Sequence, residues 1–215
     1  MISPVISPIV LSGQIEVCAS QGSGVCAEPV REEPELVCLA GGAEARLRDA
    51  TPADADGLRR MFFQLGDTTR YRYFFVGAPS TPDWAERVVA LGVADGERSY
   101  ALVAEVGAEL VGVARFDRAS DGASAEIGAL FVDAWQSRGL GRHALLRLQL
   151  VAQQWGITTL TGVVMGENER ALRLARRAFP AVHVHWEQGV YDVRVELAPT
   201  PGPSPIGRGE IRGAR

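Results

Sequence analysis

The stretch AEIGALFVDAWQSRGLG, residues 125–141, joins a predicted strand to the start of a predicted helix. Its first part, Ala125 to Val132, is mostly apolar and follows a turn-forming Ser-Asp-Gly sequence at 120–122, which is typical of a strand. Two glycines, Gly139 and Gly141, lie where the spacing of apolar residues changes from that of a strand to that of a helix. A strand, a short loop and a glycine-bearing helix start therefore follow one another directly.

The helix that begins after this loop is predicted to run from Leu140 to Trp155 and to end at Gly156. Its apolar residues recur at helical spacing, so one face is expected to pack on a sheet. These residues are Ala144, Leu148, Val151, Ala152 and Trp155.

The loop and the first helical turn have the properties of an anion-binding site. N–H groups at a helix start lack intrahelical acceptors, and the helix dipole favours negative charge there. Without side chains, Gly139 and Gly141 let phosphate oxygens approach the backbone, and Gln136, Arg138 and Arg142 offer further donors. Glycines at a helix entry also serve turn geometry alone, and on the local pattern that alternative is favoured.

The elements on either side of this stretch indicate one α/β domain over residues 43–198. The expected order is βαα(α)βββαβαββ, a mixed sheet with helices on both faces. Thr51-Pro52 and Thr81-Pro82 are helix-start signals, Gly92 is read as a C-cap, and Asn168 as an N-cap. The expected strands are 44–48, 99–106, 110–117, 125–132, 158–165, 182–186 and 190–197, and the expected helices are 51–65, 68–75, 81–91, 140–155 and 168–178.

The two ends of the chain differ in composition from this domain. Residues 1–42 are acidic and lack an apolar period, so a poorly ordered extension is expected, and residues 199–215 form a Pro/Gly-rich tail that cannot bury a core. All three cysteines precede residue 43, and their odd number suggests neither disulfides nor a metal site.

Net charge and hydropathy exclude some classes of partner. The formal net charge is −4, which argues against nucleic-acid binding. No apolar run approaches the roughly 20 residues that cross a bilayer, and Met1 to Leu11 lacks the basic segment of a secretory signal. We therefore expect a cytoplasmic protein without a membrane partner.

The spacing QSRGLG, together with the flanking strand and Asn168, resembles the (Q/R)xxGx(G/A) element of the GNAT superfamily of N-acetyltransferases. This resemblance implies a mostly antiparallel, seven-stranded sheet and acetyl-CoA as co-substrate, with no metal. It also implies that the pantetheine arm pairs with the backbone of Leu130, Phe131 and Val132 beside residues 163–165. Asn168 matches an asparagine that contacts this arm in the family.

Three segments carry a closer resemblance, to the catalytic domain of bacterial Pat-type protein lysine acetyltransferases. They are RLRDATPADADGLRRMFFQLGDTTRYRYFF at 46–75, VGVARFDR at 111–118 and AEIGALFVDAWQSRGLGR at 125–142. In that group a glutamate in an Ala-Glu-(Ile/Val) context is the general base, and Glu126 matches it. The implied acceptor is a lysine of a protein, with a small-molecule amine as the alternative and a non-catalytic acyl-CoA-binding module as a third hypothesis.

The chemistry of amines independently supports a role for Glu126 as general base. An alkyl ammonium group has a pKa near 10, so only about one amine in a thousand is free at neutral pH and a base is required. Partial burial in an apolar strand would raise the pKa of Glu126 and improve it as a base. The competing interpretation is an ordinary strand carboxylate that faces the solvent. Many relatives place an acid tyrosine seven residues after the asparagine, where this chain has Ala175, and Tyr71, Tyr73 and Tyr191 are candidate substitutes.

Overall fold

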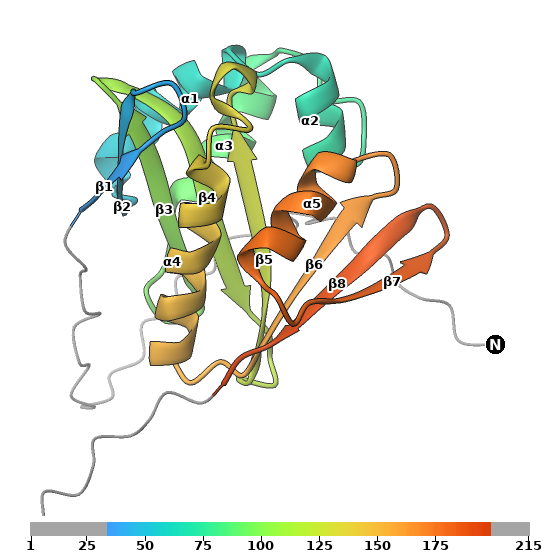
Figure 1. The fold of residues 1–215 in the computed structure, drawn as a ribbon. Helices are drawn as coiled ribbons and strands as arrows, with labels where there is room; N and C mark the ends of the chain where they lie inside the picture. The colour runs from blue at the N-terminus through green and yellow to red at the C-terminus, as the bar shows by residue number, and fades with distance from the viewer. Residues whose placement is uncertain (1–33, 199–215) are drawn as a thin grey trace, which may run out of the picture.

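The computed structural model describes residues 34–198. A single sheet of eight strands runs through the molecule in the order β1-β2-β3-β4-β5-β6-β8-β7, and only the pair β5 and β6 is parallel. Helices α1, α2 and α3 lie on one face of the sheet and α4 and α5 on the other (Figure 1). The strands are β1 (Glu35–Cys38), β2 (Glu44–Asp49), β3 (Ser99–Val106), β4 (Glu109–Arg118), β5 (Ser124–Phe131), β6 (Thr159–Met165), β7 (His183–Glu187) and β8 (Val190–Glu196).

The five helices follow the expected places closely. They are α1 (Ala55–Phe63), preceded by the 3-10 turn Pro52–Asp54, α2 (Asp67–Phe74), α3 (Pro82–Gly92), α4 (Leu140–Gln154) and α5 (Glu169–Ala178). The mixed, mostly antiparallel sheet with helices on both faces is thus confirmed. No helix among residues 34–198 is long and apolar enough to cross a membrane.

The predicted count of seven strands is wrong, because β1 precedes the expected start of the domain at residue 43. It pairs antiparallel with β2, from Glu35 opposite Leu47 to Cys38 opposite Glu44. Val37 and the following Leu39 are buried in the core, so this hairpin belongs to the domain. The last part of the extension predicted for residues 1–42 therefore belongs to the sheet. Its residues 1–33 and the predicted tail 199–215 lie outside the described residues.

Gly92 has a different role from the predicted C-cap. It is the last residue of α3, and Val93 is the residue that caps the helix. A methyl group at position 92 would overlap the side chain of Leu58 on α1. The glycine therefore allows α1 and α3 to approach closely, which a pattern of local turn residues does not reveal.

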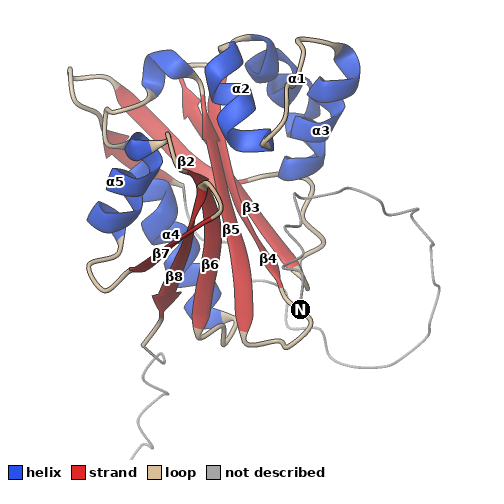
Figure 2. Cartoon of the chain, turned by 90° about the vertical axis from the view of Figure 1, so that its right-hand side faces the viewer, coloured by secondary structure: helices blue, strands red, loops and turns tan. Residues whose placement is uncertain are grey.

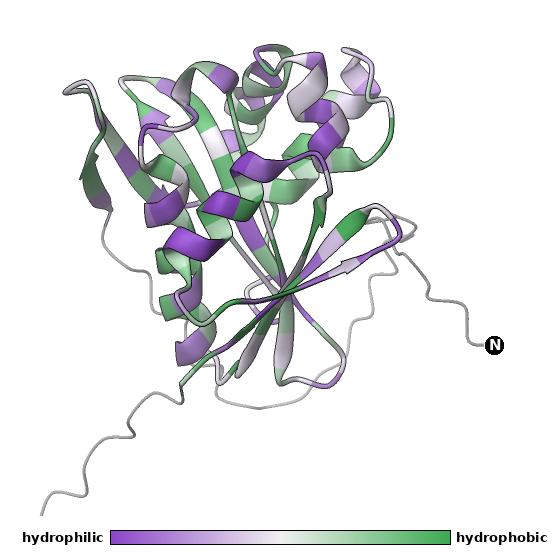
Figure 3. Ribbon diagram, turned by 45° about the vertical axis from the view of Figure 1, so that its right-hand side comes forward, coloured by the Kyte–Doolittle hydropathy of each residue, from purple (hydrophilic) through white to green (hydrophobic). Residues whose placement is uncertain are grey.

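Each face of the sheet has its own apolar core. Leu58, Met61 and Phe62 of α1 pack with α3 against Val113 and Leu130. On the other face, Ala144, Leu148 and Ala152 of α4 pack against the strands, as their spacing predicted. The outward turns of α5 are strongly hydrophilic (Figure 3). The strands β4 and β5 are packed between the two layers, β6 packs on the α4 side, and the site is built on these strands.

Candidate active site

The central sheet opens between β5 and β6. The two strands pair only from Ser124 opposite Thr159 to Glu126 opposite Thr161, and their later residues are not paired with each other. β5 stays paired with β4, and β6 with β8, along the rest of their lengths. A cavity of about 1040 Å³ lies at this opening and is lined by residues of both strands. We call it the β5–β6 gap.

The register of β5 decides which backbone groups point into the β5–β6 gap. The N–H of Val132 donates to Val111 O of β4 at 2.9 Å, and the N–H of Thr159 in β6 donates to Ala123 O at 3.2 Å. Because the two sides of a strand alternate residue by residue, Ile127, Ala129 and Phe131 direct their N–H and C=O groups toward β6. The C=O of Phe131 already accepts a hydrogen bond from Gln136, so an extended ligand would pair with the other groups in the gap.

The far end of the gap meets the start of α4. Gly139 precedes the helix with φ +99°, a left-handed conformation that glycine adopts without strain. At Gly141 a methyl group would lie 2.9 Å from Leu174 Cδ2, so the glycine also lets α5 pack against α4. Arg142, Arg173 and Arg177 line the cavity near this helix start. Helix N–H groups and guanidinium groups thus face the same space, as a phosphate-bearing ligand requires.

Gln136 connects the loop to three other elements. Its amide nitrogen donates to Phe131 O at 2.8 Å and to Thr69 Oγ1 of α2 at 3.2 Å, while its amide oxygen accepts from Arg170 Nη1 of α5 at 2.6 Å. The Thr69 hydroxyl in turn donates to Asp133 at 2.6 Å. The Gln136 side chain, expected as a donor to phosphate, instead holds the loop, the end of β5 and both helices in place.

Glu126 is the last residue of β5 that pairs with β6. Its side chain is exposed and lines the cavity. The cavity walls nevertheless remove part of its hydration, and this desolvation raises its pKa. The negative charge of Asp117, its cross-strand neighbour, raises the pKa further. Asp117 also forms an ion pair with Arg115. An accessible carboxylate with a raised pKa is suited to accept a proton.

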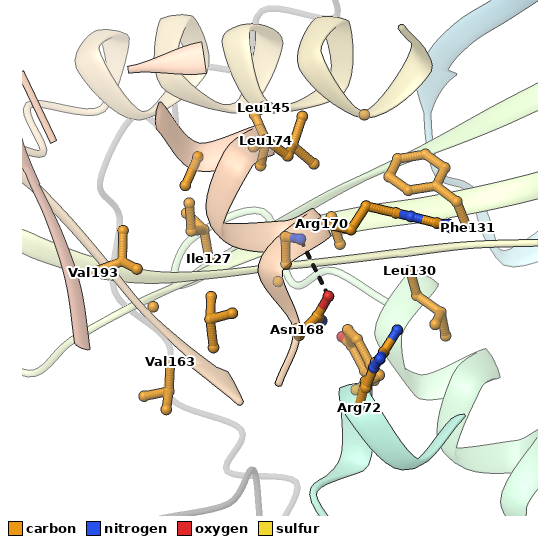
Figure 4. Close-up of a pocket in the computed structure, with 18 of the residues that line it drawn as sticks. Arg72, Ile127, Leu130, Phe131, Leu145, Val163, Asn168, Arg170, Leu174 and Val193 are labelled. Carbon is orange, nitrogen blue, oxygen red and sulfur yellow. Dashed lines mark hydrogen bonds between the residues drawn. The ribbon is translucent and has the colours of Figure 1, made fainter. Parts of the chain in front are cut away.

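Asn168 and Ala175 lie on the α5 side of the cavity. The Asn168 side chain accepts a hydrogen bond from Ala171 N at 3.2 Å and so caps α5, as predicted (Figure 4). Ala175 is buried and lines the cavity. Ile127 and Leu174 line the cavity on the face of the sheet that α4 and α5 cover, and Val163 of β6 lines it from the opposite side (Figure 4).

A family model described as "Acetyltransferase (GNAT) domain" matches residues 45–178, which is more than half of the chain. The chain belongs to the GNAT acetyltransferase family. It is an N-acetyltransferase, and acetyl-CoA is its co-substrate.

Solved GNAT structures share the fold. The GNAT domain of S. lividans PAT is 27% identical with a TM-score of 0.69, covering 76% of this chain and 97% of that one. The acetyltransferase yncA of Salmonella typhimurium, solved with acetyl-CoA, is 20% identical with a TM-score of 0.52, covering 74% and 97%. Spermidine N-acetyltransferase of Vibrio cholerae, solved with CoA and spermine, is 15% identical with a TM-score of 0.55, covering 72% and 96%.

The GNAT cavity brings together most of the residues predicted from the sequence. The predicted residues that line it are Glu126, Leu130, Phe131, Gln136, Gly139, Gly141, Arg142 and Asn168. Val132 and Arg138 do not line the cavity. The N–H of Val132 donates to β4, and the Arg138 guanidinium lies 4.9 Å from the centre of the Trp135 ring. Of the three residues expected to pair with the pantetheine arm, Phe131 alone directs its backbone into the gap.

Sequence reasoning missed the residues that other elements contribute to the cavity. Arg72 of α2, Thr161 of β6 and Asp192 of β8 all line it, and the sequence analysis assigns none of them a role. They share the cavity with Glu126 because the fold brings distant segments together. Among residues 34–198, no three His, Cys, Asp or Glu side chains form a group that could hold a metal ion.

Proposed function

We propose that the protein transfers the acetyl group of acetyl-CoA to the side-chain amine of a lysine in another protein, with Glu126 as general base. The observation that carries this proposal is the position of Glu126, an accessible carboxylate at the point where β5 and β6 separate. The Pat-like segments at 46–75, 111–118 and 125–142, together with 27% identity to the S. lividans PAT domain, support a protein acceptor.

The open face of the sheet supports entry of a side chain from a large partner. Helices α1, α2 and α3 cover only one end of this face, and the ends of β5 and β6 where the two strands pair are free of helices (Figure 2). Glu126, near the start of β5, lies on this face, because it shares the side of the strand with Leu130 in the α1 and α3 core. A lysine of a folded protein can therefore approach Glu126 without entering an enclosed chamber.

The reaction follows from these positions. Glu126, directly or through a water, takes a proton from the acceptor ammonium, and the free amine attacks the thioester carbon. A backbone N–H directed into the β5–β6 gap stabilises the oxyanion. The carbon–sulfur bond then breaks with its electron pair on sulfur, and the second proton of the former ammonium passes through water to the thiolate. The amine reacts with the thioester itself, so no acyl-enzyme forms.

A panel of acceptors tests the substrate class. The protein is incubated with acetyl-CoA and, separately, with candidate proteins that include an acyl-CoA synthetase and with small amines that include spermine. Release of CoA and mass spectrometry of the acceptors measure transfer. We expect acetyl-lysine in a protein acceptor. Turnover confined to small amines would exclude the protein-lysine assignment and leave the acetyltransferase assignment intact.

The pH dependence of the rate is expected to follow the raised pKa of Glu126. The base must be ionised, so kcat should fall as the pH drops through this pKa, and the midpoint should lie above the ordinary value of 4.5. Asp117→Asn removes a negative charge that raises this pKa and should move the acid limb to lower pH. A midpoint that stays in place or rises in Asp117→Asn would contradict the assignment of this limb to Glu126.

A further inference from the structure

Tyr73 of α2 reaches the β5–β6 gap at the one residue of β5 that has no side chain. A methyl group at Gly128 would lie 3.0 Å from the Tyr73 hydroxyl oxygen. The ring packs edge-on against Phe74 with centres 5.0 Å apart, and Phe74 packs in the same way on Trp84 at 5.0 Å. Tyr73 lines the same cavity as Glu126. An aromatic cluster therefore directs this hydroxyl at the strand that carries the proposed base.

The helix that carries Tyr73 is fixed at its start. The buried Arg70 side chain donates to Ala78 O at 2.8 Å and also bonds to Leu65 O and Asp67. Thr69 is held by Asp133 at 2.6 Å. The Tyr73 hydroxyl is thus placed by a rigid element, which is a requirement for a group that acts on a transition state.

The Tyr73 hydroxyl has no partner of its own in the described part of the chain. Within residues 34–198 it makes no hydrogen bond, although its ring is partly buried. Burial also raises its pKa, so the group stays protonated and can donate at neutral pH. A fixed donor that no group of the described residues engages and that opens onto a substrate cavity is available to a ligand atom that accepts.

We propose that the Tyr73 hydroxyl and the N–H of Ala129 together bind the thioester carbonyl oxygen of acetyl-CoA and stabilise the oxyanion formed during transfer. The Ala129 N–H belongs to the peptide group next to Gly128 and points into the gap, while the hydroxyl approaches Gly128 from the α2 side. Gly128 and Glu126 share one face of β5, so the Tyr73 hydroxyl and the proposed base lie on the same side of the strand. This proposal rests on the proposed function, because it requires the thioester to lie in the β5–β6 gap.

The proton balance favours the carbonyl oxygen over sulfur as the atom that Tyr73 contacts. The nitrogen–carbon bond forms, and the carbon–sulfur bond breaks with its electron pair on sulfur. Of the two protons that the acceptor nitrogen loses, the first goes to Glu126 and the second passes through water to the departing sulfur. A thiolate, whose conjugate acid has a pKa of about 8.5, is too weak a base to remove the proton of a tyrosine with a raised pKa. Tyr73 therefore keeps its proton and acts by hydrogen bonding, a role that the buried Ala175 on α5 does not fill.

The Tyr73→Phe variant tests this role, with Tyr71→Phe as its matched control. Tyr71 lies on the same helix, is 41% exposed and is not among the residues that line the cavity. Loss of one oxyanion donor is expected to lower kcat about 10²-fold in Tyr73→Phe while the Kd of acetyl-CoA stays within about twofold. Tyr71→Phe should match the wild type in both.

A spectroscopic measurement separates this proposal from the proposed function, because it needs no acceptor. Acetyl-CoA labelled with ¹³C at the thioester carbonyl is bound to the wild type and to both variants, and the carbonyl resonance is recorded. A hydrogen bond from Tyr73 shifts this resonance downfield on binding, and the shift should shrink in Tyr73→Phe alone. An identical resonance in wild type and Tyr73→Phe would overturn the proposal, and so would a loss of kcat that is matched by loss of acetyl-CoA binding.

Discussion

The Glu126→Gln variant is expected to transfer acetyl groups about 10³-fold more slowly than the wild type at neutral pH, with little change in the Kd of acetyl-CoA. Glutamine keeps the size and polarity of the side chain but cannot accept the ammonium proton, and positioned bases contribute about 10²- to 10⁴-fold. Steady-state kinetics give kcat, and calorimetry gives the Kd. Glu44→Gln, an exposed change on strand β2, is the control and should leave both unchanged.

The ratio of the wild-type kcat to the kcat of Glu126→Gln should fall as the pH rises toward the pKa of the acceptor amine. At that pH much of the amine is already free, so a base gives less advantage. A Glu126→Gln enzyme that retains the wild-type rate at pH 7 would rule out Glu126 as the base. If the wild type binds acetyl-CoA but transfers to no acceptor, a non-catalytic acyl-CoA-binding module becomes the better description.

The Gly139→Asp variant is expected to bind acetyl-CoA about 10³-fold more weakly. A carboxylate a few ångströms from the pyrophosphate costs about 4 kcal/mol at an effective dielectric constant of 20, which corresponds to a factor of this order. A side chain at this position meets no atom within 4 Å, so the expected loss comes from charge and from the left-handed backbone of Gly139, where φ is +99°. Calorimetry with acetyl-CoA measures the change.

Gly139→Asn separates these two causes. Asparagine has the size of aspartate, tolerates the left-handed conformation and carries no charge. Gly139→Asn carries only the backbone strain that Gly139→Asp shares, so its Kd for acetyl-CoA should lie much closer to that of the wild type than the Kd of Gly139→Asp does. If acetyl-CoA binding weakens equally in Gly139→Asn and Gly139→Asp, backbone strain is the cause. If the Kd of acetyl-CoA is unchanged in Gly139→Asp, the pyrophosphate binds elsewhere.

Local chemistry explains which parts of the fold the sequence predicts well. The Thr-Pro starts of the helices, the β-branched run before Met165 and the Asn168 cap depend on neighbouring residues, and the structure places these elements within a few positions of expectation. Gln188 and Gly189, with φ of +46° and +90°, form the turn between β7 and β8, in the interval that the sequence leaves between its last two expected strands. Each of these signals is set by backbone preferences within one element.

Contacts between distant segments account for what the sequence did not reveal. β1 lies in an acidic, proline-containing stretch, and its strand character comes from pairing with β2 and from burial of Val37. The Gln136 side chain matches the family motif, yet its partners Thr69 and Arg170 come from other helices. Tyr73 was one of three candidate tyrosines on sequence, and only the tertiary contact with Gly128 distinguishes it.

The β5–β6 gap gives the protein two strand edges inside its sheet. An edge on the outside of a sheet invites pairing with another chain and hence aggregation, which proteins suppress with charge, proline or bulges. Here the edges of β5 and β6 face each other across a gap that closes at Glu126, and α4 and α5 cover one side of it. The backbone can therefore offer hydrogen-bonding groups to a slender extended molecule, while a β-strand from a neighbouring protein has no flat edge within this gap on which to dock.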